Sequence, residues 1–161
     1  MFVDVSDWYD YPEHRTIYNT DRHYFNCGGY ALGSFGWYWP AVDEDEQMKI
    51  NSLFQRKAYR KADKIMVNRI FEDFPELVEV KAEWVRNHEI DYKKFEIIAF
   101  RSAHCQYCWD FHFRKLGANG RWYEKCGSNY KIYDYSYNSI FDIWNGRYNG
   151  KIYFFARRRP Q

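Results

Sequence analysis

The sequence lacks several features that would assign it to a class of protein. No apolar run approaches the roughly 20 residues of a membrane span, and the first residues, MFVDVSDWYDY, carry acids where a secretory signal has a basic and then an apolar stretch. The net charge is only +2, and neither an internal repeat nor a long linker divides the 161 residues. We therefore expect a single domain spanning 1–161, located in the cytoplasm and not bound to a membrane.

Cysteines are scarce, with only four in the chain: Cys27, Cys105, Cys108 and Cys126. In a reducing cytoplasm they are expected to be thiols or metal ligands and not disulfides. Cys105 and Cys108 have the Cys-x2-Cys spacing of zinc ligands, and Cys126 or His112 could complete the set. A complete zinc ribbon has a second such pair, which this sequence lacks. Zinc is thus the minor alternative, and we expect no cofactor.

Aromatic residues are abundant instead, with Trp 7, Tyr 16 and Phe 13. The rings run through the whole chain and do not cluster with Lys and Arg, which favours a core and groove walls over a stacking platform for bases. The basic stretch RKAYRKADK (56–64) is interpreted as the solvated face of a helix. We therefore do not expect nucleic acid as a partner.

The order of the predicted elements indicates an α+β fold. A short helix is expected over 27–39, ending before Pro40, and a long helical region over 43–73, where apolar residues recur three or four apart. Another short helix is expected within 76–87. Four segments are typical of strands: 95–102, 107–116, 121–127 and 151–158. The sequence predicts N-terminal helices packed on a C-terminal antiparallel sheet of about four strands.

Cys27 opens the stretch CGGYAL directly after Asn26, a residue that favours the N-cap position of a helix. In the first helical turn, unpaired N–H groups and the positive end of the helix would stabilise a thiolate. The N–H of Cys27 could also form part of an oxyanion hole. Gly28 and Gly29 have two interpretations: they leave room for a substrate carbonyl, or they permit close packing around a buried, unreactive cysteine.

A cysteine nucleophile needs a histidine as its base and a polar group that orients the ring. His112 is the best candidate, because it lies within an aromatic strand where a surface role is hard to explain. If the turn at 117–120 carries a left-handed bulge at Gly120, His112 faces Cys126, and Glu124 lies within diagonal reach on the same face. A two-residue turn would instead shift the register and move Glu124 to the other face.

Three pieces of the chain, NCGGYAL (26–32), DFHF (110–113) and NGRWYEKCG (119–127), followed by an apolar strand, resemble papain-like cysteine hydrolases. The similarity is to NlpC-type peptidases and to small Cys–His proteins of bacteriophages and bacteria. The resemblance implies that Cys27 is the nucleophile and His112 the general base. Glu124 stands where relatives often have a second histidine or another polar residue. A helical insert at about 43–91 is not explained by the resemblance.

The resemblance further implies cleavage of an amide, isopeptide or thioester bond in a peptide or protein substrate. Asn26 and Gly28 would lie beside the substrate, and tryptophans expected to be exposed would line its groove: Trp37, Trp39, Trp109 and Trp122. The alternative is a non-catalytic binding protein on the same scaffold, such as a bacteriophage inhibitor of a host or defence protein. Fold does not determine function, and aromatic surfaces make good interface anchors.

Overall fold

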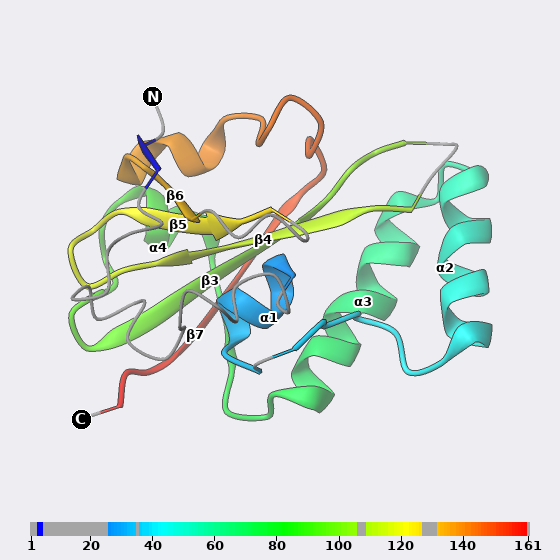
Figure 1. Ribbon diagram of the computed structural model, residues 1–161, viewed down its shortest axis with the longest axis horizontal. Coiled ribbons are helices and arrows are strands. Elements are labelled where there is room, and N and C mark those ends of the chain that lie inside the picture. The colour runs from blue at the N-terminus through cyan, green and yellow to red at the C-terminus, as the bar shows by residue number, and fades with distance from the viewer. Residues whose placement is uncertain (1–2, 5–25, 35, 106–108, 127–131, 161) are drawn as a thin grey trace.

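The computed structural model describes residues 3–4, 26–34, 36–105, 109–126 and 132–160 (Figure 1). In chain order the elements are β1 (Val3–Asp4), α1 (Cys27–Leu32), α2 (Glu44–Gln55), α3 (Tyr59–Asp73), β2 (Val78–Val80), α4 (Ala82–Arg86), β3 (Phe95–Ser102), β4 (Phe111–Leu116), β5 (Trp122–Lys125), β6 (Ile132–Tyr135), the 3-10 helix η3 (Tyr137–Phe141) and β7 (Ile152–Arg158). The strands form one sheet in the order β1-β6-β5-β4-β3-β7-β2, and all neighbours are antiparallel. The predicted α+β class is confirmed.

The sheet contains more strands than the roughly four expected. β3 occupies the predicted range 95–102, and β4, β5 and β7 lie within the other predicted strands. The strands that sequence reasoning missed, β1, β2 and β6, have two to four residues each. β2 lies within 76–87, where a helix was expected, and only α4 in that range is helical. Segments this short carry too little alternation to be recognised, and their pairing partners in the sheet determine their conformation.

The first helix is shorter than the predicted range 27–39. α1 ends at Leu32, because Gly33 adopts a left-handed conformation (φ 71°) and its N–H donates to the carbonyl of Gly29 at 3.1 Å. This is a common way for a helix to end, and it satisfies a carbonyl that would otherwise lack a partner. The residues from 36 to 40 therefore form an irregular segment that passes back over α1.

The helical region predicted over 43–73 consists of two helices, α2 and α3, that pack against each other (Figure 1). Asp43 caps α2 by accepting a hydrogen bond from the N–H of Glu46 at 2.9 Å. The break falls at Lys57, which is left-handed (φ 58°) and donates its N–H to the carbonyl of Phe54 at 2.9 Å. No glycine or proline marks this break, so the sequence pattern did not reveal it.

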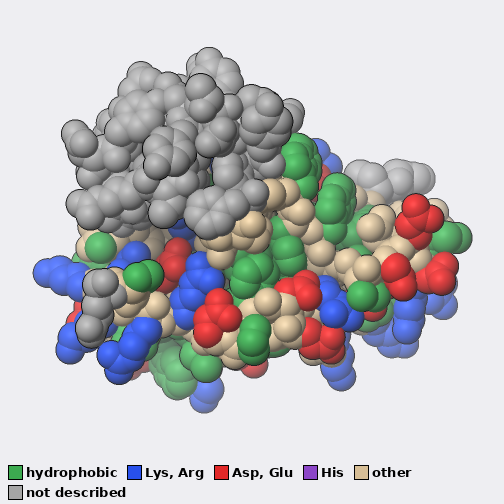
Figure 2. Space-filling view, turned by 60° about the horizontal axis from the view of Figure 1, so that its bottom comes forward, with side chains coloured by type: hydrophobic (Ala, Val, Ile, Leu, Met, Phe, Trp, Pro, Cys, Tyr) green, Lys and Arg blue, Asp and Glu red, His purple; other side chains and the backbone are tan. Residues whose placement is uncertain are grey.

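Both faces of the central sheet are covered. Ile98 and Phe100 of β3 belong to the core shared with α1, α2 and α3, whereas Ile97 and Ala99 point to a second core that includes Val85 of α4. β4, which carries His112, is likewise buried at every residue. In the part of the chain that is described, no helix has the length and hydropathy needed to cross a bilayer. On the face shown in Figure 2, acidic and basic side chains are interspersed.

Candidate active site

Cys27 is the first residue of α1, and Asn26 is its N-cap, as the sequence predicted. The Oδ1 atom of Asn26 accepts hydrogen bonds from the N–H groups of Gly29 and Tyr38, both at 2.9 Å, and its Nδ2 donates to the carbonyl of Tyr38 at 2.7 Å. One amide therefore fixes both the start of α1 and the segment that crosses it. The N–H of Cys27 points out of the first turn, where the helix offers it no acceptor.

The two glycines after Cys27 serve close packing. A Cβ on Gly28 would lie 3.0 Å from the ring of Tyr38 and 3.3 Å from the ring of Phe113. A Cβ on Gly29 would lie 1.8 Å from the carbonyl oxygen of Gly36, a contact that no side chain can make. Gly28 is not among the residues that line the cavity described below, and its expected place beside a substrate stays a prediction. Both glycines therefore permit close packing, while Cys27 itself lines the cavity.

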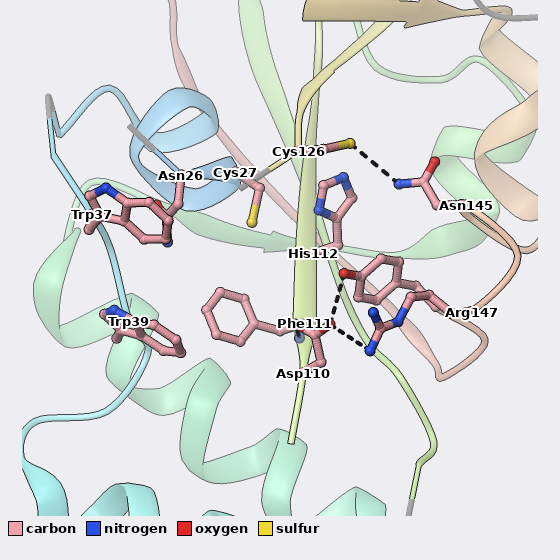
Figure 3. Close-up of a pocket in the computed structure, with 11 residues that line it drawn as sticks. Asn26, Cys27, Trp37, Trp39, Asp110, Phe111, His112, Cys126, Asn145 and Arg147 are labelled. Carbon is pink, nitrogen blue, oxygen red and sulfur yellow. Dashed lines mark hydrogen bonds and ion pairs between the residues drawn. The ribbon is translucent and has the colours of Figure 1, made fainter. Parts of the chain in front are cut away.

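Cys27 and His112 line one cavity of about 370 Å³ (Figure 3). Cys27 is only 6% exposed and His112 2%, so the cavity is their route to solvent. Figure 3 shows one ring nitrogen of His112 pointing toward the sulfur of Cys27. The other lining residues are Asn26, Trp37, Trp39, Asp110, Phe111, Cys126, Asn145, Arg147 and Tyr148.

The hairpin between β4 and β5 has the bulged register. Leu116 pairs with Trp122, the N–H of Gly117 donates to the carbonyl of Arg121 at 2.9 Å, and Gly120 is left-handed (φ 79°). The bulge prediction is confirmed, and the alternative two-residue turn is wrong. As that register requires, the side chains of His112 and Glu124 meet diagonally: Nε2 of His112 contacts Oε2 of Glu124.

Glu124 is a fully buried carboxylate whose oxygens are held by several donors. Besides His112, its Oε2 accepts from Nε of Arg114 at 3.2 Å and from Nδ2 of Asn145 at 3.1 Å, while Oε1 accepts from the hydroxyl of Tyr135. Burial alone would raise the pKa of Glu124, but the charges and hydrogen bonds of His112 and Arg114 lower that pKa to about 2. Glu124 is therefore ionised at neutral pH.

The state of Glu124 decides the protonation of the His112 ring. An ionised carboxylate only accepts, so Nε2 of His112 carries the proton in their hydrogen bond, and Nδ1 is the nitrogen left to face the thiol. Burial lowers the pKa of His112, but the charges of Cys27 and Glu124, with hydrogen bonds to Cys126 and Cys27, raise that pKa well above its usual value. These interactions favour the charged, imidazolium form of His112.

Aromatic rings fix the orientation of the imidazole. Tyr148 stacks on His112 with ring centroids 4.9 Å apart and an interplanar angle of 19°, and Trp144 meets the ring edge at 6.2 Å. The hydroxyl of Tyr148 donates to Asp110 at 3.0 Å, and Arg147 forms an ion pair with the same carboxylate at 2.9 Å. The ring therefore has little freedom to turn away from Cys27.

Sequence reasoning missed the turn that supplies these contacts. Residues 144–147 form a tight turn with Asn145 (φ 53°) and Gly146 (φ 72°) both left-handed, closed by a 3.1 Å hydrogen bond from the N–H of Arg147 to the carbonyl of Trp144. The dipeptide Asn-Gly is the usual signal for this turn type and could have located it. Nothing in the sequence indicates that Asn145 reaches Glu124, because the two lie 21 residues apart.

The expected groove tryptophans fall into three groups. Trp37 and Trp39 line the cavity and are 49% and 45% exposed. Trp109 lies behind Trp39, with ring centroids 5.7 Å apart, and its Nε1 donates to the sulfur of Met66 at 3.1 Å. Trp122 is fully buried on the opposite face, where its Nε1 donates to the carbonyl of Tyr137 at 2.8 Å, so its assignment to the groove is wrong.

Potential metal ligands occur in the same place. Among the described residues, His112, Glu124 and Cys126 form a group whose ligand atoms lie within 4.8 Å of one another. Cys105 does not belong to this group, and Cys108 lies outside the described residues. The zinc alternative built on Cys105, Cys108 and Cys126 therefore stays a prediction.

No protein family, curated protein or solved structure matches this chain in a comparison. The class of the site therefore follows from its geometry alone. That geometry is a thiol at the start of a helix and a buried imidazole on a strand, both lining one cavity, with a buried carboxylate on the next strand behind the imidazole.

Proposed function

We propose that this protein is a cytoplasmic cysteine hydrolase of the papain-like type, which cleaves an amide, isopeptide or thioester bond. The observation that carries the proposal is that Cys27 and His112 line one cavity while Glu124 engages the far nitrogen of the ring. This is the relation of nucleophile, base and orienting group that a catalytic triad requires. The N–H of Cys27, in the first turn of α1, adds a hydrogen-bond donor on the same residue as the sulfur.

The proposed reaction starts from a Cys27 thiolate and a His112 ring that is protonated on both nitrogens. His112 holds the thiol proton, and the Cys27 thiolate attacks the substrate carbonyl carbon, which moves the carbonyl electrons onto oxygen. The N–H of Cys27 donates to this oxyanion. When the intermediate collapses, the Nδ1 proton of His112 passes to the leaving amine or thiol, and an acyl-thioester remains on Cys27. A water deprotonated by His112 then attacks the thioester, and Cys27 leaves as the thiolate.

The cavity walls suit a peptide or protein substrate. Trp37 and Trp39 form one wall, and the turn carrying Asn145 and Arg147 forms the opposite wall (Figure 3). Pockets of a few hundred Å³ with aromatic walls and a few polar groups are typical of ligand-binding sites, and a side chain with its flanking backbone is of a size to fit one. We therefore propose that an extended segment lies between these walls with its carbonyl against Cys27.

A peptide carrying an electrophilic group, applied at neutral pH and followed by intact-mass analysis, tests the proposal. We expect one adduct per chain on the wild-type protein, none on Cys27→Ser, and an undiminished rate on Cys105→Ser, because Cys105 lies outside the cavity. In His112→Gln the rate should fall by at least about 100-fold, the usual effect of removing a general base. Equal labelling of the wild type and Cys27→Ser would rule out the proposed nucleophile.

A binding function without catalysis is the second candidate, and the exposure of Trp37 and Trp39 at the cavity mouth favours it. Exposed tryptophans are frequent anchors of protein interfaces. Such a protein, for example a bacteriophage inhibitor of a host protein, would keep its full effect in Cys27→Ser and lose it in Trp37→Ala. A hydrolase would lose its effect in Cys27→Ser.

A further inference from the structure

The His112 ring has a second side that the proposed hydrolase chemistry does not use. Cys126 lies beside the ring nitrogen that points away from Cys27 (Figure 3). Together with Glu124, these side chains place one nitrogen, one oxygen and one sulfur atom within 4.8 Å of one another. His112 and Glu124 are buried, and Cys126 is partly exposed at the cavity. The three residues thus form a compact ligand set with one open side.

The amide of Asn145 occupies the position between two of these ligands. Its Nδ2 lies 3.1 Å from Oε2 of Glu124 and 3.8 Å from the sulfur of Cys126. This N–H group is positively polarised and contacts both a carboxylate oxygen and a thiol sulfur. A cation in the same position could bind both of these atoms. Asn145 sits on the tight turn at 144–147, so it can withdraw without disturbing a helix or a strand.

We propose that His112, Glu124 and Cys126 bind a divalent cation that favours sulfur and nitrogen ligands, Zn²⁺ above all. Zinc takes nitrogen, oxygen and sulfur ligands at about 2.0–2.3 Å, and zinc sites with three protein ligands leave the fourth position to water. The cavity supplies that water, because His112 and Cys126 both line it. Magnesium and calcium prefer sets made entirely of oxygen and would not select this site.

The charges around the site are compatible with a dication. The Glu124 carboxylate and a Cys126 thiolate supply two negative charges. On binding, one proton leaves the Cys126 thiol and one leaves Nε2 of His112, and both pass to solvent. Nε of Arg114, 3.2 Å from Oε2 of Glu124, stays as a hydrogen-bond donor to the ligating carboxylate. Ligating carboxylates and imidazoles usually have such partners behind them.

A metal at this position would switch off the proposed hydrolase, a consequence that rests on the proposed function. The cation replaces the Nε2 proton, and the ring that remains is neutral with its proton on Nδ1. Such a ring would have to become an imidazolate to give that proton to the leaving group, so it can no longer act as the acid of the proposed mechanism. Zinc would therefore act as a reversible inhibitor bound by the catalytic histidine together with Cys126. Metal binding itself does not need Cys27.

The test uses the reduced, metal-free full chain titrated with Co²⁺, whose thiolate complexes absorb in the near ultraviolet, followed by displacement with Zn²⁺. We expect one Co²⁺ per chain, and in Cys126→Ser loss of the thiolate band with binding at least about tenfold weaker. Cys27→Ser and Cys105→Ser should bind like the wild type. Circular dichroism of Cys126→Ser verifies that this variant is folded.

Two outcomes would overturn the metal site. If Cys126→Ser keeps the thiolate band, Cys126 is not a ligand. If Cys105→Ser loses the band, the ligands are the zinc set predicted from Cys105 and Cys108 instead. The result is separable from the proposed function: Co²⁺ binding by Cys27→Ser measures the metal site alone, whereas peptide-probe labelling of the metal-free wild type measures the nucleophile alone.

Discussion

Replacing Glu124 by glutamine preserves the shape of the side chain and removes its charge. The pKa of Glu124 falls from an ordinary 4.5 to about 2 in the folded protein. By linkage, that lowering corresponds to roughly 3 kcal/mol of stability at neutral pH. The partners are buried: the side chain of Glu124 is 0% exposed and that of His112 3%. Breaking a buried pair by removing one member typically costs about 3–5 kcal/mol, in agreement with this value.

The pH dependence of this stability difference tests the prediction most directly. Because the pKa of Glu124 is lower in the folded state, its contribution is fully present above about pH 5 and is lost as the pH falls toward 2. Urea unfolding followed by tryptophan fluorescence should show Glu124→Gln less stable than the wild type by about 3 kcal/mol at pH 7 and by about half as much at pH 3. The exposed carboxylate Glu89 provides the control, since Glu89→Gln should change stability by less than about 0.5 kcal/mol. An equal deficit for Glu124→Gln at both pH values would refute the linkage to ionisation.

Three further predictions concern the frame of the site. Gly29→Ala should destabilise the fold by at least about 3 kcal/mol in thermal unfolding because its Cβ meets backbone at 1.8 Å, whereas Gly36→Ala, with open space around its Cβ, should be nearly neutral. Asn26→Ala should cost about 2 kcal/mol, because it removes an N-cap and two hydrogen bonds to the crossing segment; an unchanged unfolding midpoint would contradict its role. Trp122→Ala should lose about 3–5 kcal/mol of stability, whereas Trp37→Ala should keep stability and slow labelling by the peptide probe. If Trp37→Ala lost stability and Trp122→Ala slowed labelling instead, the cavity would have been assigned to the wrong face of the sheet.

The parts of the fold that were predicted are those with strong local signals. β3 follows from a run of Ile and Phe, and the β4–β5 register follows from the glycines that flank its turn. Asn26 before Cys27 gave the start of α1. Those signals were enough to bring His112 and Glu124 together, since register alone determines which side chains share a face of a hairpin.

The remaining features depend on contacts between distant segments. The break at Lys57 places a non-glycine residue at positive φ, so no local pattern predicts it. Trp122 and Trp37 are the same residue type, and only the sheet decides that the first is buried and the second exposed. The donors that hold Glu124 include Asn145, which approaches from a turn that sequence reasoning treated as a loop.

The position of β7 has a consequence for synthesis of the chain. β7 follows all the other described strands along the chain, yet it lies between β3 and β2 and pairs with both. On the ribosome, both partners emerge before the strand that joins them, and a ribosome stalled before residue 152 would present two open strand edges, which are templates for aggregation. The edges of β3 and β2 that face β7 therefore stay without their partner until β7 itself has emerged.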